Sequence, residues 1–159
     1  MRVLVTGGAG FIGSHLVDAA VRLLGKPKAV RPFLRKHGRF DDSLKDNNVA
    51  VLEYDRATAV LINTALQAGA TPQRCFEVLG TNGTAILQPI EPPTLTIDLA
   101  KPAGPYKKGV QNVPLPAYQR YEGDLAELAA AARGEGPLSV SLDDELLVAE
   151  TVFRVSDMI

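Results

Sequence analysis

The spacing of apolar positions predicts a strand and then a helix at the start of the chain. Residues 3–5 form a short apolar run of the kind that builds buried strands, and a glycine-rich turn follows at once. From Phe11 to Leu24 apolar residues recur on one helical face, until Gly25 and Pro27 end the helix. The first 24 residues therefore predict a strand, a glycine loop and a helix, in that order.

The middle of the chain has the spacing of strands. Two pairs of β-rich runs are separated by turn residues, and each pair predicts a hairpin. The turn is Asp55-Arg56 in the first pair and Gly80-Thr81-Asn82-Gly83 in the second, where Asn-Gly is the turn signal. An edge strand is predicted before them and two strands after them, the last two joined by a loop rich in Pro, Gly and Lys. That loop is either a surface connector or a binding lid. The predicted strands cover residues 28–34, 48–54, 57–66, 74–79, 84–87, 94–99 and 111–115.

Helical spacing returns in the last third of the chain. Residues 121–133 carry an apolar stripe, and Gly134 ends this helix. A final helix is predicted to begin near Ser141, which pairs with Asp144 in a capping box, and to run to about Met158. Five or six largely antiparallel strands followed by two helices predict an α+β fold, with an open, mainly antiparallel sheet and helices on one face.

Composition excludes several classes of protein. Hydrophobic residues make up 46% of the chain, charged residues 22%, and the net charge is −1, so neither a disordered tail nor a nucleic-acid-binding surface is expected. The single cysteine, Cys75, excludes an internal disulfide and is expected to be a core thiol rather than a metal ligand or a nucleophile. No apolar stretch suits a signal peptide or a membrane span. We therefore expect one compact cytoplasmic protein of 159 residues, with no membrane partner.

The glycine loop has the chemistry of a phosphate site. Gly7, Gly10 and Gly13 stand where a dinucleotide-binding turn needs a tight turn, a close approach of the backbone to the pyrophosphate, and close helix packing. The N–H groups and dipole of the following helix favour the negative charge of a phosphate. The sequence TGGAGFIGSHLV resembles the start of extended short-chain dehydrogenases of the nucleotide-sugar epimerase type. This resemblance implies a Rossmann-like strand-loop-helix fragment over residues 1–24 and NAD or NADP as the cofactor.

Two features of a complete epimerase are missing. A dinucleotide fold needs an acidic residue about 20 positions after the glycine loop to hold the ribose hydroxyls, but the end of the next predicted strand carries Arg31, Arg35 and Lys36. These residues either suit the 2′-phosphate of NADP or mark a solvated edge strand. The epimerase pair Tyr-x-x-x-Lys, in which the lysine lowers the pKa of the tyrosine, is also absent, because no tyrosine is followed by a lysine four residues later.

The body of the chain resembles a second family. The segments HLVDAAVRLLGKPKAV, LEYDRATAVL, FEVLGTNGTAIL and YEGDLAELAAAARGEGPLSVSLDDELLVAETV have the order and spacing of the C-terminal domain of the Gfo/Idh/MocA oxidoreductases, from about Gly13 onward. The resemblance implies a C-terminal domain over residues 25–159, whose open sheet lines the substrate site and commonly forms the oligomer interface. It also implies hydride transfer between NAD(P), held by a separate Rossmann domain, and a sugar or polyol.

His15 is the candidate catalytic residue. Hydride leaves a carbinol carbon only as the hydroxyl loses its proton, so the reaction needs a base. In the family a helix carries an Asp and, four residues later, a His that matches His15, while a structural Asp three residues further matches Asp18. Phe11 replaces the first Asp, and the family's Glu-Lys-Pro motif is absent. His15 therefore lacks the partner that would fix its tautomer and tune its pKa, and in the epimerase-like interpretation it is an ordinary helix residue.

Three functional hypotheses follow from these patterns. The first is a truncated or chimeric NAD(P)-dependent oxidoreductase of the Gfo/Idh/MocA type that acts on a sugar or polyol and is weak or inactive alone. The second is a non-catalytic binding or oligomerisation module whose sheet face pairs with another copy or with a complete relative. The third, ranked last, is an NAD-dependent nucleotide-sugar epimerase.

Overall fold

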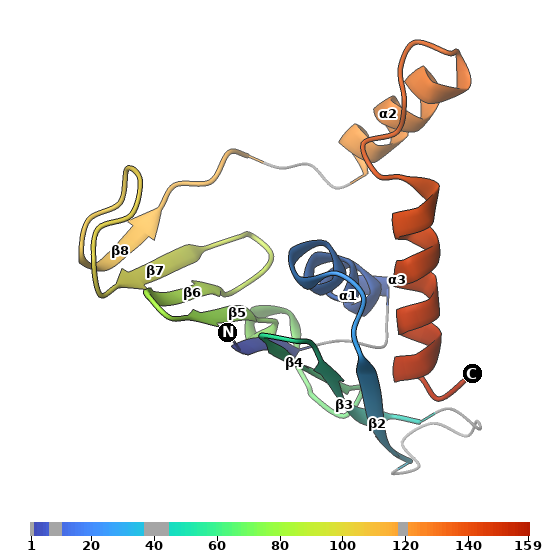
Figure 1. Cartoon of the computed structure of the whole chain (residues 1–159), viewed down its shortest axis with the longest axis horizontal. Coiled ribbons are helices and arrows are strands. Elements are labelled where there is room, and N and C mark those ends of the chain that lie inside the picture. The colour runs from blue at the N-terminus through green and yellow to red at the C-terminus, as the bar shows by residue number, and fades with distance from the viewer. Residues whose placement is uncertain (1, 7–10, 37–44, 118–120) are drawn as a thin grey trace.

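A single sheet forms the centre of the molecule (Figure 1). The computed structural model describes residues 2–6, 11–36, 45–117 and 121–159, with the backbone alone described for 2–6 and 11–16. Its eight strands lie in the order β2-β3-β4-β1-β5-β6-β7-β8. Their bounds are β1 Arg2–Thr6, β2 Ala29–Arg35, β3 Asn47–Glu53, β4 Thr58–Thr64, β5 Phe76–Gly80, β6 Gly83–Leu87, β7 Leu95–Leu99 and β8 Gly109–Val113.

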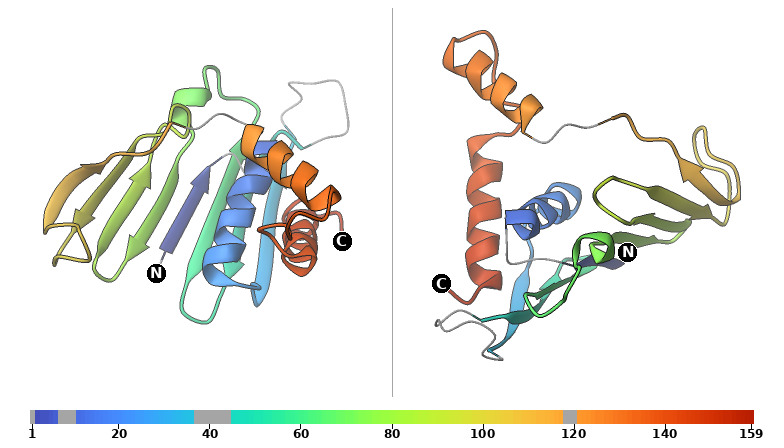
Figure 2. Two further views of the ribbon diagram at one scale, coloured as in Figure 1. Left: turned by 90° about the horizontal axis from the view of Figure 1, so that it is seen from above. Right: turned by 180° about the vertical axis from the view of Figure 1, so that it is seen from behind.

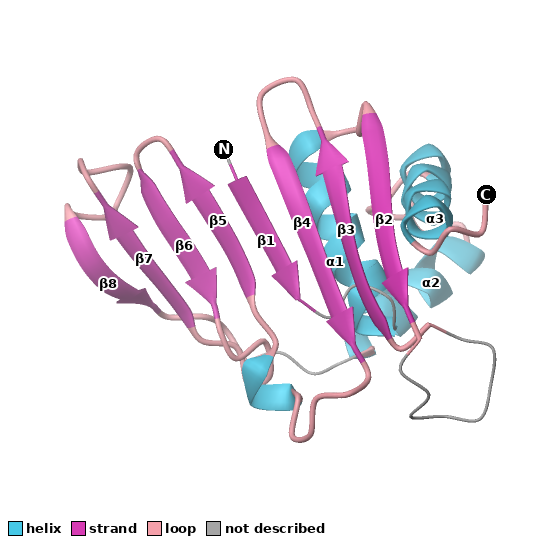
Figure 3. Ribbon diagram, turned by 90° about the horizontal axis from the view of Figure 1, so that it is seen from below, coloured by secondary structure: helices cyan, strands magenta, loops and turns pink. Residues whose placement is uncertain are grey.

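The helices gather on one side of this sheet. Helix α1 (Phe11–Leu24) and helix α3 (Leu142–Val155) cover the half that contains β2, β3 and β4, while α2 (Glu122–Ala132) projects beyond them (Figure 2). A short 3₁₀ turn, η1 (Thr71–Gln73), precedes β5. The other face of the sheet carries no helix from the described part of the chain (Figure 3). The predicted α+β class, an open and mainly antiparallel sheet with helices on one face, is confirmed.

Both predicted hairpins are present. Strands β3 and β4 pair antiparallel from Asn47 opposite Thr64 to Glu53 opposite Thr58, and the chain turns at Asp55-Arg56 as expected. In the second hairpin, Gly80 and Gly83 form the last pair of β5 and β6. The predicted turn covered Gly80 to Gly83. The structure shortens it to Thr81 and Asn82, because Gly80 and Gly83 already belong to β5 and β6.

Strand β1 differs most from the expectation. It lies between β4, to which it is parallel, and β5, to which it is antiparallel. In a Rossmann unit the strand after the first helix lies close beside the first strand and parallel to it. Here that strand is β2, which forms the edge of the sheet and is separated from β1 by β3 and β4. The described backbone therefore does not show a Rossmann-like fragment. All eight strands coincide with runs predicted from the sequence, and the sheet holds two or three more strands than the five or six expected in it.

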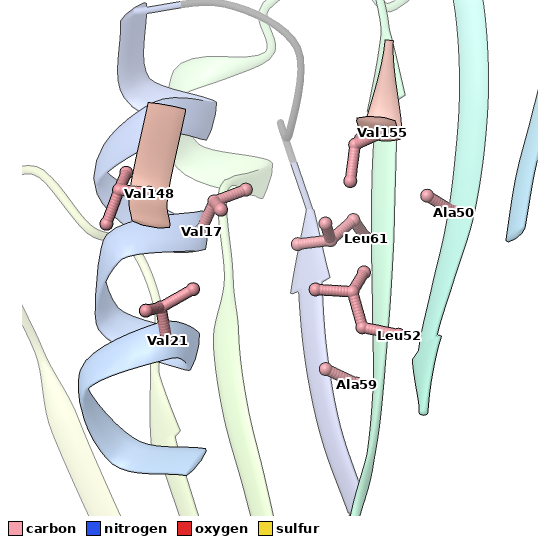
Figure 4. Close-up of a cluster of buried hydrophobic side chains, with 8 residues drawn as sticks. All are labelled: Val17, Val21, Ala50, Leu52, Ala59, Leu61, Val148 and Val155. Atoms are coloured by element: carbon pink, nitrogen blue, oxygen red, sulfur yellow. The ribbon is translucent and has the colours of Figure 1, made fainter. Parts of the chain in front are cut away.

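The core lies between the helix-covered half of the sheet and helices α1 and α3. Alternate positions of β3 and β4 point inward, where small Ala side chains let the helices approach and Leu side chains fill the space between them. Burial of this apolar surface is the main force that holds the helices on the sheet. The eight buried residues, shown in Figure 4, are Val17, Val21, Ala50, Leu52, Ala59, Leu61, Val148 and Val155.

The predicted helix ends are also confirmed. Gly25 follows α1 with φ of 77°, a left-handed conformation that favours glycine, and its N–H donates to the carbonyl of Val21 at 2.6 Å. At the start of α3, the N–H of Asp144 donates to Ser141 Oγ at 3.1 Å. The Ser141 hydroxyl donates in turn to Asp144 Oδ2 at 2.7 Å. These contacts fix where α1 stops and where α3 begins.

Candidate functional site

At one end of its strands, the sheet brings together the start of α1 and the last residues of β1 and β4. Thr6 of β1 lies opposite Ile62 of β4, and the next row joins Asn63 of β4 to Asn48 of β3. Helix α1 begins at Phe11, shortly after β1 ends. We call this region the α1 edge. It is the place where the sequence predicts both a phosphate-binding turn and a catalytic histidine.

The structure places two of the four predicted site residues on one helix. Gly13 and His15 lie in the first half of α1, close to the α1 edge. Gly7 and Gly10 lie outside the described residues. The cofactor role of the three glycines and the base role of His15 therefore stay predictions, while the helix that carries His15 is confirmed.

Asp18, which matches a structural Asp of the family, forms an ion pair on the surface of α1. Arg22 Nε donates to Asp18 Oδ1 at 2.7 Å, one helical turn apart on α1. This hydrogen bond raises the pKa of Arg22. The described contact of the Asp18 carboxylate is therefore with Arg22, further along the same helix.

Two buried polar side chains at the α1 edge were missed by sequence reasoning. Asp46 and Asn48 are 5% and 8% exposed, respectively. The Oδ1 atom of Asn48 is buried and has no hydrogen-bond partner among the residues that the structure describes. Asp46 directly precedes β3, and Asn48 is its second residue. Both alternate with the same period as Ala50 and Leu52, so they lie on the side of β3 that faces the helices. The signal was therefore available in the alternation of β3, where polar residues occupy inward positions at one end of the strand.

The same edge contains the entry to β5 and the loop after β6. Phe76 of β5 pairs with Leu87 of β6, so the residues before and after these strands lie at that end of the sheet. Arg74 and Glu91 form an ion pair there, with 4.0 Å between Nη1 and Oε2. Cys75 is partly buried, and burial together with the charge of Glu77 raises the pKa of its thiol. A protonated thiol at neutral pH agrees with the prediction that Cys75 is not a nucleophile.

Neither a tyrosine acid-base group nor a metal site is found in the described residues. Burial raises the pKa of Tyr54 to about 12, the opposite of the lowering that an epimerase tyrosine needs. Across the described ranges, His, Cys, Asp and Glu nowhere form a group of three that could hold a metal ion. No helix in the part of the chain that the structure describes has the length and apolar character to cross a membrane.

The described residues do not form a cradle for a dinucleotide. Strand β2 is not the neighbour of β1, so the crevice that normally receives the cofactor is not built by these strands. Arg31, considered above for a 2′-phosphate, donates to Glu53 Oε1 at 2.6 Å across the β2–β3 edge. That contact lowers the pKa of Glu53 and matches the interpretation of β2 as a solvated edge strand.

Comparison with known families decides the affiliation. The GFO/IDH/MocA C-terminal domain matches residues 4–86, just over half of the chain. The chain belongs to this family. The matched segment of this chain begins within β1 and ends within β6, so it includes α1 and both hairpins. It also begins before the glycine loop, earlier than the boundary near Gly13 that the sequence suggested. The resemblance of the loop itself to epimerases is not confirmed.

Solved structures of oxidoreductases share the fold over the whole chain. Biliverdin reductase from Synechocystis, solved with biliverdin and NADP⁺, superposes with a TM-score of 0.75 at 12% identity, over 99% of this chain and 54% of its own. Levoglucosan dehydrogenase, solved with NADH and levoglucosan, superposes with a TM-score of 0.73 at 17% identity. The match covers 99% of this chain and 55% of that protein. UDP-N-acetylglucosamine 3-dehydrogenase from Acidithiobacillus ferrooxidans superposes with a TM-score of 0.72 at 16% identity. The match covers 99% of this chain and 53% of that protein.

These structural relatives are about twice as long as the present chain. The chain spans about half of each of them. At these identities the likeness establishes the fold. No curated protein matches the sequence.

Proposed function

We propose that this chain provides the substrate-side domain of an NAD(P)-dependent oxidoreductase acting on a sugar or polyol, and that alone it is weakly active or inactive. The observation that carries the proposal is the match of residues 4–86 to a C-terminal domain. The described strands do not form a crevice for a dinucleotide, and the structural relatives are about twice as long as this chain. The same proposal puts the chain in the cytoplasm, where its single cysteine stays reduced.

His15 is the proposed base in this reaction. It lies on α1 near the α1 edge, and its imidazole can accept a hydroxyl proton as hydride leaves the neighbouring carbon. Phe11 stands one turn before it, where a carboxylate would orient the ring. A base without that partner is poorly tuned, which is a second reason to expect low activity.

The direct test measures reduction of NAD⁺ or NADP⁺ by the purified chain, with glucose and inositol as probe substrates. We expect no turnover above that of the His15→Gln variant. Sustained turnover that His15→Gln abolishes would support His15 as the base but overturn the need for a separate cofactor domain. Measurable turnover above the protein-free background that is equal in both proteins would overturn the role of His15.

The uncovered sheet face supports self-association as a second function. Phe33 of β2 and Val110 of β8 point to this side and are 58% and 73% exposed, with Leu79 of β5 between them at 36%. Unpartnered apolar surface of this kind marks an interaction site. We infer a homo-oligomer through the sheet face, and sedimentation of Phe33→Glu tests it: loss of association supports the interface, and unchanged association argues against it.

An epimerase remains the last of the three proposals. The raised pKa of Tyr54 and the absence of a Tyr-x-x-x-Lys pair both count against it. Interconversion of a UDP-sugar by the purified chain would revive it.

A further inference from the structure

Helices α2 and α3 carry a large apolar surface that the described chain does not cover. Helix α3 is apolar on two sides: Val148, Thr151 and Val155 are buried, while Leu142, Leu146 and Phe153 lie outward at helical spacing. Helix α2 buries none of its side chains. The exposed large apolar residues of the pair, each between 40 and 73% exposed, are Leu125, Leu128, Leu138, Leu142, Leu146 and Phe153.

The same segment is strongly acidic. Residues 122–159, the acidic helix pair, contain nine Asp or Glu against two Arg, a net charge of −7, whereas the preceding residues contain nine acidic and fifteen basic side chains, a net charge of +6. Glu127 holds the pair together by accepting hydrogen bonds from the N–H and the hydroxyl of Ser139. Three exposed carboxylates beside the leucines, those of Glu122, Asp124 and Asp143, have no ion-pair partner among the described residues.

A surface of opposite charge lies elsewhere on the chain. The loop between β7 and β8, residues 100–108, contains three exposed lysines and no acidic residue. Tyr106, 38% exposed, adds an aromatic ring, and its backbone pairs with that of Ala103. The side chain of Gln111 fixes the loop, since its Oε1 accepts from the N–H of Lys107 at 3.3 Å. We call this the basic loop. Its lysines, Lys101, Lys107 and Lys108, have no ion pair within the described ranges.

The two surfaces cannot meet within one molecule. Figure 1 shows the β7–β8 hairpin and helices α2 and α3 toward opposite ends of the longest axis, with the sheet between them. Contact between two acidic helix pairs would bring like charges together, which opposes association. Contact between the acidic helix pair of one copy and the basic loop of another joins opposite charges and covers the leucines.

We propose that a second copy of this chain covers the acidic helix pair with its basic loop. About a two-fold axis the contact forms twice, because each copy offers both surfaces, and the assembly closes as a dimer. This interface is separate from the uncovered sheet face, so the two can form independently.

Charge reversal with a matched pair of variants tests the interface. In the first variant Lys101, Lys107 and Lys108 are changed to Glu, and in the second Glu122, Asp124 and Asp143 are changed to Lys. The first variant places like charges at both contacts. The second lowers the net charge of the acidic helix pair from −7 to −1 and puts lysines at three positions that face the basic loop, so we expect the dimer dissociation constant of each variant to rise at least about tenfold. An equimolar mixture restores opposite charges at both contacts, so sedimentation equilibrium should recover the dimer. Circular dichroism checks that each variant is folded.

Several results would overturn the proposal. A wild-type chain that stays monomeric, a dimer that neither variant weakens, or a mixture that does not reassociate would each contradict it. If Phe33→Glu dissociates the dimer and the charge variants do not, the sheet face alone forms it. If the acid-to-lysine variant unfolds, two other measurements test the interface: the association of the L142Q/L146Q variant and the salt dependence of wild-type association. We expect the two substitutions and added salt each to weaken the dimer.

Discussion

Tyr54 is the residue whose environment has the most direct measurable consequence. Its ring packs against the core cluster, and its hydroxyl is buried with no hydrogen-bond partner in the described part of the chain. A buried polar group that is not hydrogen-bonded costs stability. We expect Tyr54→Phe to raise the free energy of unfolding by up to about 1 kcal/mol at neutral pH, measured by urea denaturation. Tyr106→Phe, at an exposed phenol, is the control and should have little effect.

The same residue makes stability depend on alkaline pH. The pKa of Tyr54 is raised from 10.0 to about 12 in the folded state. Between these values the unfolded chain releases the phenolic proton and the folded chain keeps it, so stability falls as pH rises through this window. Allowing for partial solvent screening, we expect a loss of about 1–2 kcal/mol in the wild type and a smaller loss in Tyr54→Phe. Equal losses in both proteins would contradict this assignment.

Gly83 is required by a close approach of two strands. A Cβ atom built there would lie 2.0 Å from the carbonyl oxygen of Asp98 on β7, and no side-chain movement relieves a clash with backbone. We expect Gly83→Ala to lower the free energy of unfolding by about 1–3 kcal/mol. Gly136→Ala, where nothing lies within 4 Å, is the matched control and should change it by less than about 0.5 kcal/mol. A similar loss at both sites would argue against the strand contact.

At the scale of elements, local signals predicted most of the structure. The turn at Asp55-Arg56, the end of α1 at Gly25 and the start of α3 at Ser141 all depend on residues within a few positions of each other, and all three are confirmed. The pairing of β1 with β4 and β5 joins residues far apart in the chain, and no local pattern specifies it. That is why β1 was expected in a separate fragment, although the strand itself was predicted.

The candidate site was predicted in part for the same reason. The helix that carries His15 follows from its apolar spacing, and its place at the α1 edge follows only once β1 is in the sheet. Burial of Asn48 depends on which face of β3 the helices cover, and that choice is made by tertiary packing.

The capping box of α3 can be tested as a single element. Ser141 Oγ both accepts from the N–H of Asp144 and donates to its carboxylate. We expect Ser141→Ala to lower the free energy of unfolding by about 1 kcal/mol, since an N–H at the helix start loses its partner. Ser141→Thr keeps the hydroxyl and should restore most of the loss. Denaturation that is unchanged in Ser141→Ala would show that the cap contributes nothing to stability.

At the scale of the whole molecule, the fold is shared with about half of each longer structural relative. A GFO/IDH/MocA C-terminal domain, a continuous sheet through β1 and structural relatives of about twice the length all fit a chain that receives its cofactor from elsewhere. The glycine loop is the one feature that points the other way. Its Gly7, Gly10 and Gly13 are the residues through which the chain itself would hold a dinucleotide.

Calorimetric titration of the purified chain with NAD⁺ and NADP⁺ tests this account most directly. We expect no saturable heat with either dinucleotide, because the described strands do not build the crevice that a dinucleotide needs. Saturable binding that is lost in Gly10→Val would contradict the account and establish the glycine loop as a cofactor site of this chain.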